Sequence, residues 1–470
     1  MFGVKVVTGA AAAVLLLACA GPAPALADTI EAALVRAYQG NPQLNAQRAL
    51  VRATDEGVPQ ALSGYRPKVN LTATAGVQYT DSLSVVGPNP ATGATTRLGN
   101  HAEEAPRSAT ISATQTLYNG QQTANGVRAA EGQVSGAREA LRNIEQNVLL
   151  TGATTYMDYL RDAAIVEVQR SNVRVLEQTL KQTRDRFNVG EVTRTDVAQS
   201  EAQLAAGRTQ LATAEANLTT TRSRFRQIIG NEPENLAPGS PVDRFFPGTL
   251  PAAVELSLIE NPNVTAAMFG VDVNYLQVRI KEGALLPTVT LQASATQAYE
   301  QQLTVQKSFT AQAVAQLSVP IYQGGAEYSL IRQAKESLAQ QRLNLDTTRD
   351  QTRATTVTAW GQLVSGKAQV ISAQAQVTAS EIALNGVREE AKAGQRTTLD
   401  VLNAQQTLVN ARIALVTAQH DRVVASYTVL SAVGRLSPQV IGLATNTYDA
   451  SVHYQQVRDS WVGVRTPDGR

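Results

Sequence analysis

The chain contains two copies of one sequence plan. Residues 117–230 align with residues 321–434 without a gap, at a constant offset of 204 positions. Gly190, for example, falls on Gly394. The segments upstream align at an offset of 220, and the difference, 220 − 204 = 16, places a 16-residue insertion in the first copy between residues 80 and 107. A long gap-free repeat is typical of rigid elements of fixed length, and repeats determine architecture.

The duplication divides the chain into five segments. We expect a signal peptide at 1–27, repeat one at 28–230, an inter-repeat linker at 231–248, repeat two at 249–434, and a tail at 435–470. Each repeat should contain a helix, two strands and a long helical hairpin.

The first 27 residues have the pattern of an export signal. Lys5 precedes an apolar region at 10–18, and Ala25-Leu26-Ala27 forms a small-residue cleavage site. Leu16-Leu17-Ala18-Cys19 also fits a lipoprotein processing box, so acylation of Cys19 stays open beside cleavage after Ala27. Both alternatives place the protein outside the cytoplasm. Cys19 is the only cysteine, which excludes an intramolecular disulfide.

Composition excludes several classes of protein. The net charge of +2 gives no reason to expect a nucleic-acid partner. After the signal, no segment approaches the run of ~18 apolar residues that a membrane helix needs. Aromatic residues make up 5% of the chain, and the sequence is rich in Ala, Gln, Thr and Val. This composition favours long helices packed through small side chains.

Four short segments alternate apolar and polar residues with period two. They lie at 69–80, 109–117, 289–296 and 309–321. Each has about the length of a tilted membrane strand with lipid on one face and water on the other, although an ordinary antiparallel sheet would also alternate. The aromatic residues expected at the strand ends, as in an interfacial girdle, are Tyr79, Tyr118, Tyr299 and Tyr322. The segment 81–107, which contains the insertion, is expected to be a flexible loop.

A long helical stretch follows each strand pair. Residues 121–189 contain no proline, and a continuous helix of that length would span on the order of 100 Å. Apolar residues recur every seven positions, which predicts coiled-coil packing. The predicted seam residues are Val127, Val134, Leu141, Val148, Val166, Val173, Leu180 and Phe187 in the outgoing helix of repeat one, Val197, Leu204, Leu211, Leu218 and Phe225 in its returning helix, and Leu402, Val409, Val416, Val423 and Leu430 in repeat two.

Glycine and threonine mark the two hairpin turns. Gly190 and Gly394 end the outgoing helices, and the hydroxyls of Thr193 and Thr397 can cap the returning ones.

Four strands cannot close a membrane barrel alone, because the smallest bacterial barrels have about eight. An open sheet edge in lipid leaves unpaired backbone groups at several kcal/mol each. If the strands cross a membrane, the protein must therefore oligomerise. Three copies give 3 × 4 = 12 strands; the closure arithmetic alone also permits a dimer or a tetramer.

The motifs together resemble those of the TolC family of outer-membrane efflux and secretion channels. The similarity extends from Asp28 to about Trp461. The motifs that carry it are Pro67 and Pro287 between helix and strand, Leu117-Tyr118-Asn119-Gly120 and Ile321-Tyr322-Gln323-Gly324 between strand and helix, and the hairpin tips at 187–197 and 394–402.

The resemblance implies an α+β, mainly α fold. Three chains would form a 12-stranded outer-membrane β-barrel continuous with a periplasmic α-helical barrel. It also implies an exit duct of a tripartite export system, docked to a periplasmic adaptor and an inner-membrane ABC or RND transporter, with outer-membrane lipid around the barrel. It implies that the 81–107 loop is extracellular, that the tail at 435–470 lies on the periplasmic equatorial region, and that no cofactor is bound.

The resemblance also implies a gate at the periplasmic end. Asp400 would form a ring of three carboxylates, and Arg396, Thr195 and Asp196 would link neighbouring hairpins. Two positions depart from the family pattern: Asn403 stands where a second acidic residue is usual, and Ala391 where a linking tyrosine is expected. The first departure predicts a weaker cation block. The expected adaptor contacts are Gly190, Glu191, Gly394 and Gln395 at the tips.

Two other classes of protein remain to be weighed. An enzyme is poorly supported, because His101, His420 and His453 share no metal-ligand spacing and no nucleophile or phosphate-loop motif occurs. A trimeric coiled-coil surface fibre would share the seven-residue repeat but not the duplicated strand pairs. Within the channel interpretation, the tail slightly favours a duct shared by drugs and secreted proteins.

Overall fold

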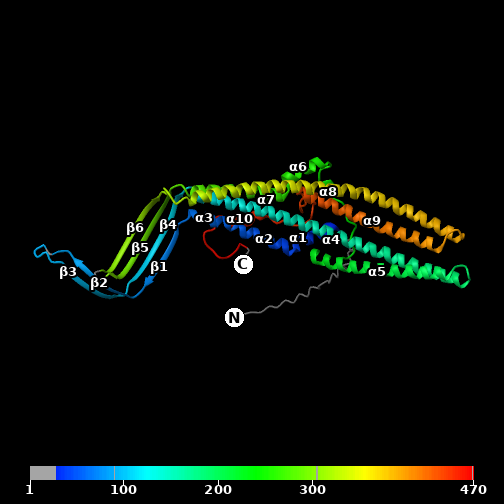
Figure 1. Ribbon diagram of the computed structural model, residues 1–470, viewed down its shortest axis with the longest axis horizontal. Coiled ribbons are helices and arrows are strands. Elements are labelled where there is room, and N and C mark those ends of the chain that lie inside the picture. The colour runs from blue at the N-terminus through cyan, green and yellow to red at the C-terminus, as the bar shows by residue number, and fades with distance from the viewer. Residues whose placement is uncertain (1–27, 89, 303–304, 468, 470) are drawn as a thin grey trace, which may run out of the picture.

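The protein is elongated, with a β-sheet at one end and two helical hairpins at the other (Figure 1). The computed structural model describes residues 28–470 except 89, 303, 304, 468 and 470. The expected signal peptide and Cys19 lie outside the described residues. The sheet and the hairpin tips occupy opposite ends of the long axis.

The helical hairpins have identical lengths in the two repeats. Helices α4 (Gln122–Asn188) and α8 (Ala326–Lys392) each contain 67 residues, or about 100 Å. Helices α5 (Arg194–Ile229) and α9 (Thr398–Val433) each contain 36. Every boundary differs by 204 positions between the repeats, which confirms the predicted duplication.

The four long helices form a wall in the order α5–α4–α9–α8, because the closest pairs are α4 with α5, α8 with α9, and α4 with α9. Most predicted seam residues are buried or half-buried in it. Phe187 is an exception: it lies one residue before the end of α4 and is exposed, because the hairpin ends there and nothing covers it.

Shorter helices surround the middle of the molecule. In chain order these are α1 (Ile30–Gly40), α2 (Pro42–Asp55), α3 (Gly57–Leu62), the 3-10 turns η1 (Ser63–Tyr65) and η2 (Asp243–Phe245), α6 (Leu250–Glu260), α7 (Pro262–Gly283) and α10 (Ala450–Val457). Asn41 and Asn261 cap α2 and α7 in equivalent positions, each followed by proline. The largest apolar core lies here, where α1 packs on α4.

The main sheet has four antiparallel strands in the order β1–β4–β5–β6. Their bounds are β1 Lys68–Ala75, β4 Arg107–Asn119, β5 Thr288–Gln302 and β6 Val305–Ser318. Strands β1 and β6 are its two edges. Large apolar side chains stay uncovered in the single chain, for example Leu71 at 76% and Phe309 at 68% exposure.

The insertion forms a β-hairpin, so the prediction of a flexible loop at 81–107 was wrong. Strands β2 (Gln78–Val86) and β3 (Thr96–Glu104) pair in a separate two-stranded sheet beyond the main one (Figure 1). The predicted single strand at 69–80 is therefore two strands. Gly76 follows the last residue of β1, and its N–H donates to the Pro106 carbonyl at 3.0 Å. The chain passes from the main sheet to the second sheet at this point.

The last strand is shorter than predicted. Strand β6 ends at Ser318, whereas the alternation continued to Ile321. Pro320 explains the difference, because proline has no N–H to donate to a ladder. Its equivalent in repeat one is Thr116, and β4 accordingly continues to Asn119.

Gly120 shows why the strand-to-helix motif needs glycine. Its φ is +66°, and a Cβ built there would lie 2.2 Å from the Gly283 carbonyl oxygen. Strand β4 therefore passes into α4 through a backbone contact with the end of α7 that no larger residue permits.

Candidate functional site: the hairpin tips

Both hairpin turns are built in the same way. Gly190 and Gly394 have φ values of +82° and +78°, so each chain reverses through the left-handed region that glycine favours. Glu191 N–H donates to the Arg186 carbonyl and Gln395 N–H to the Glu390 carbonyl, both at 2.9 Å. These bonds close the last turns of α4 and α8.

The returning helices start with matching capping boxes. The Thr193 hydroxyl accepts from the Asp196 N–H, and the Asp196 carboxylate accepts from the Thr193 N–H at 2.9 Å. Thr397 and Asp400 repeat this arrangement at 3.0 Å. The predicted threonine caps are confirmed, and the two tip carboxylates have a local structural role as well as their predicted functional one.

These hydrogen bonds favour the ionised carboxylates. The Thr397 backbone N–H and then its hydroxyl lower the pKa of Asp400 in the single chain. The Thr193 hydroxyl and N–H lower the pKa of Asp196 in the same way. In the predicted ring, three Asp400 carboxylates would instead raise each other's pKa, so the predicted assembly and the observed capping would act in opposite directions.

The tip cations pair within their own hairpins. Arg396 Nε lies 2.8 Å from Glu390 Oε2, and Arg186 Nε lies 2.9 Å from Glu191 Oε2. Among the described residues, no ion pair joins Arg396 to Asp196. Sequence reasoning missed Glu390 because a pair six residues apart across a turn has no helical spacing. Pairing between hairpins of neighbouring chains stays a prediction.

The remaining predicted gate and tip residues are accessible. Thr195 is exposed on the first turn of α5, and Asn403 is exposed on the second turn of α9. The predicted adaptor contacts are also exposed; they are Gly190, Glu191, Gly394 and Gln395. The structure thus collects the predicted residues at one end of the molecule without bringing the repeat-one and repeat-two sets into contact.

The four tyrosines lie at two levels of the sheet. Tyr118 is next to last in β4, and Tyr322 lies between β6 and α8. Tyr79 is the second residue of β2, and Tyr299 pairs with Arg107 at the end of the main sheet that lies away from the helices. All four are exposed, and their role at a membrane interface stays a prediction.

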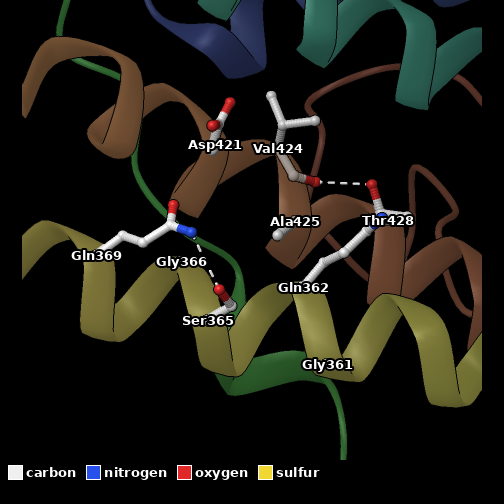
Figure 2. Close-up of a pocket in the computed structure, with 9 residues that line it drawn as sticks. All are labelled: Gly361, Gln362, Ser365, Gly366, Gln369, Asp421, Val424, Ala425 and Thr428. Atoms are coloured by element: carbon white, nitrogen blue, oxygen red, sulfur yellow. Dashed lines mark hydrogen bonds between the residues drawn. The ribbon is translucent and has the colours of Figure 1, made fainter. Parts of the chain in front are cut away.

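A groove of about 500 Å³ lies farther up the helical wall, between α8 and α9 (Figure 2). Small and polar residues line it, including Gly366, Gln369 and Asp421. Gln369 precedes the end of α8 by 392 − 369 = 23 residues, or about 35 Å. The groove is therefore separate from the tips and contributes nothing to their chemistry.

The described residues contain no cluster of three or more His, Cys, Asp or Glu side chains able to hold a metal ion. No helix in the same part of the chain combines the length and the apolar character needed to cross a bilayer.

Comparisons with known proteins agree with this architecture. The family model for outer membrane efflux proteins matches residues 33–231 and 253–435, one segment in each repeat. The outer membrane efflux protein BepC of Brucella suis is 40% identical over 450 residues, covering 95% of this chain and 94% of BepC. The outer membrane protein TolC of Escherichia coli is 25% identical over 433 residues, covering 86% and 83%.

A solved structure shares the fold. The outer membrane protein VceC of Vibrio cholerae superimposes with a TM-score of 0.71 at 18% identity, covering 86% of this chain and 96% of VceC. Members of the matched family are channels, which excludes the enzyme and surface-fibre alternatives. The chain with duplicated helical hairpins on an open sheet thus belongs to the outer membrane efflux protein family.

Proposed function

We propose that the protein is the outer-membrane exit duct of a tripartite export system and works as a homotrimer. The observation that carries this proposal is the open four-stranded sheet, whose edges β1 and β6 lack partners among the residues that the structure describes. Three copies would pair each β1 with the next β6 and close a barrel of 3 × 4 = 12 strands. Closure removes the edges that lipid does not tolerate.

The helical hairpins continue this barrel into the periplasm. Three copies of the α5–α4–α9–α8 wall would surround one passage of about 100 Å, long enough to cross much of the periplasm. The aromatic residues Tyr79, Tyr118, Tyr299 and Tyr322 would face the lipid headgroups. Drugs, secreted proteins or both would leave the cell through this passage.

The periplasmic entrance would be the gate. Asp400 lies on the first turn of α9, so three copies would place three carboxylates around the entrance and favour cations there. Asn403, one turn farther, adds no charge, which predicts a weaker cation block than two acidic rings would give. Arg396 would leave Glu390 to link with Thr195 and Asp196 of a neighbouring hairpin, since an exposed pair is worth only about 0–1 kcal/mol.

The exposed tips would receive the partners. At the end of each hairpin, Gly190 and Gly394 present accessible backbone, and Glu191 and Gln395 present exposed polar side chains. A periplasmic adaptor with helical hairpins of its own would pack against them, and an inner-membrane ABC or RND transporter would supply the cargo.

Ion flow through planar bilayers tests the duct and the gate together. Purified wild-type protein should give discrete, cation-preferring openings, and Asp400→Asn should lose part of that preference. Asp196→Asn is the matched comparison, because it removes the capping carboxylate of the other repeat. That carboxylate is proposed to link hairpins, so the variant should raise the open-to-closed ratio but leave ion selectivity unchanged.

Two results would count against the proposal. Trimeric, membrane-inserted protein that never conducts would refute the duct. Openings whose selectivity is the same in wild type and Asp400→Asn would keep the duct but reject the Asp400 ring.

A further inference from the structure

The C-terminal tail leaves the middle of the molecule and reaches the start of the main sheet. Beyond α10, Ser460 and Trp461 lie against Arg66, which precedes the first residue of β1, Lys68, by two positions. Arg66 Nη1 donates to the Ser460 carbonyl at 2.6 Å, and the Arg66 guanidinium lies over the Trp461 ring, 4.5 Å from its centroid. The tail therefore ends beside the junction between the helices and the sheet (Figure 1).

Contacts upstream hold this part of the tail in place. His453 and Val457 of α10 are both buried, and His453 Nδ1 lies 3.0 Å from Oδ2 of the fully buried Asp55. The Ser460 N–H then donates to the Val457 carbonyl at 3.0 Å. The chain is thus fixed as far as Trp461, whose position follows from packing and hydrogen bonds.

Apolar side chains are nevertheless uncovered at the end of the tail. Trp461 is 67% exposed, Val462 is 90% exposed, and Val464 is fully exposed. Tyr65, next to Arg66 in the sequence, is 51% exposed. A single exposed apolar residue is ordinary on a protein surface, whereas a group of them marks a surface that binds something. We call Tyr65, Trp461, Val462 and Val464 the tail patch.

The tail patch lies at the level of the proposed membrane boundary. Gln115 Nε2 of β4 donates to the Tyr65 carbonyl at 2.7 Å, so Tyr65 is level with Gln115. Tyr118, one of the proposed interfacial aromatic residues, follows Gln115 by three positions, or about 10 Å along an extended strand. Trp461 is therefore close to the depth at which phospholipid headgroups would surround the sheet.

The tail also lies on the side of the wall that would face away from the passage. Tyr448 and Ala450 pack against the apolar core that α1 forms on α4, and α10 packs on α2. The tail and α1 therefore belong to one layer of short elements. Three copies of that layer would fill the passage if it faced inward. In the proposed trimer the layer faces outward, so the bilayer is the surface beside the tail patch.

We infer that the C-terminal tail is an anchor that binds the phospholipid headgroup layer on the periplasmic side of the outer membrane. The inference rests on the proposed function, because it requires the sheet to cross that membrane. An indole has an apolar body and one N–H donor, which favours tryptophan at headgroup depth. Arg66 and the exposed Lys68 and Arg465 supply positive charge for lipid phosphates, of which the nearby Asp459 offsets one.

Depth-dependent fluorescence quenching of the full chain in phospholipid vesicles tests the anchor. The chain has two tryptophans, so Trp360→Phe leaves Trp461 as the only one. Trp461 should lose more emission to lipid with a nitroxide on the headgroup than to lipid with a nitroxide at the end of the acyl chain. The matched control is Trp461→Phe, which leaves Trp360, 360 − 326 = 34 residues or about 50 Å from the start of α8, and neither lipid should quench it.

Two results would overturn the anchor. Emission from Trp461 that iodide in the water quenches but neither lipid does would show that the tail patch is bathed in solvent. Emission that neither iodide nor lipid quenches would show that a second copy of the chain covers it.

A probe in the sheet separates failure of the anchor from failure of the proposed function. Ile111→Trp, in a chain with Trp360 and Trp461 changed to Phe, places an indole in the main sheet, where Ile111 pairs with Leu71 and is 50% exposed. The nitroxide at the end of the acyl chain should quench this indole. If it does, and lipid leaves Trp461 unquenched, the anchor alone fails. If lipid quenches neither indole, the proposed function fails with it.

Arg66→Gln tests how the indole is positioned. The substitution removes the guanidinium that lies over Trp461, so headgroup quenching of Trp461 should decrease. Arg458→Gln is the matched control, because it removes an equal charge from the tail and should leave the quenching at the value of its parent. Equal losses in the two variants would show that net charge, and not the contact with Arg66, holds Trp461 at the membrane.

Discussion

Leu402 offers a quantitative test of whether the α4–α5 and α8–α9 hairpins of one chain separate when the proposed entrance opens. It is buried among side chains of repeat one, including Leu176, Leu180 and Leu204. Removing a buried leucine side chain commonly costs about 2–5 kcal/mol. If opening breaks these contacts, Leu402→Ala should remove about 2 kcal/mol per chain from the closed state alone, which is about 30-fold in the open-to-closed ratio.

Leu384 is the matched control for this prediction. It is 3% exposed, and its cluster contains Val377, Leu408 and Ala411, all within the α8–α9 hairpin. Leu384→Ala should lower the melting temperature about as much as Leu402→Ala, because both create a cavity. Only Leu402→Ala should lengthen the openings in single-channel recordings. Equal open-to-closed ratios in the two variants would refute hairpin separation at this level.

Two further predictions concern buried histidines. Burial lowers the pKa of His420, but hydrogen bonds of its ring to the carboxylates of Asp158 and Asp421 outweigh burial and raise the pKa overall. A pKa that is higher in the folded state adds stability that is fully present below the unfolded-state pKa and is lost as the pH rises through the folded-state pKa. The melting temperature should therefore fall from mildly acidic to alkaline pH. His420→Gln should make this fall smaller. His453 Nδ1 lies 3.0 Å from Oδ2 of the fully buried Asp55. His453→Ala should lower the free energy of unfolding by about 3–5 kcal/mol, because Asp55 loses its histidine partner. His101→Ala, at an exposed site, should not have this effect.

The long helices could be predicted closely because their signal is redundant. The same heptads occur twice, proline is absent, and glycine and threonine mark both turns. The hairpin at 78–104 could not be predicted, because its second strand, Thr96–Glu104, shows no clear alternation of apolar and polar residues. Its pairing depends on the neighbouring strand rather than on local pattern.

The buried hydrogen bond between Gln405 and Asn172, at 3.3 Å, could not be predicted for a different reason. Gln405 is polar and lies outside the seven-residue apolar repeat of its helix, so the repeat predicts that its side chain is exposed to solvent. Comparison of the repeats held the missing signal, because Glu201 and Gln405 differ in charge and in the ability to donate a hydrogen bond. The gate residues around Asp400 were placed at the tip, but their contacts between chains depend on assembly.

The central claim is that three copies close one conduit. The most direct test is the structure of the purified full-length protein in lipid nanodiscs, determined by single-particle electron microscopy. The account predicts three chains around one axis, with β1 of each chain paired to β6 of the next and a continuous passage from the hairpin tips to the far end of the barrel. Edges β1 and β6 left unpaired in lipid, or a trimer without a passage along its axis, would contradict it.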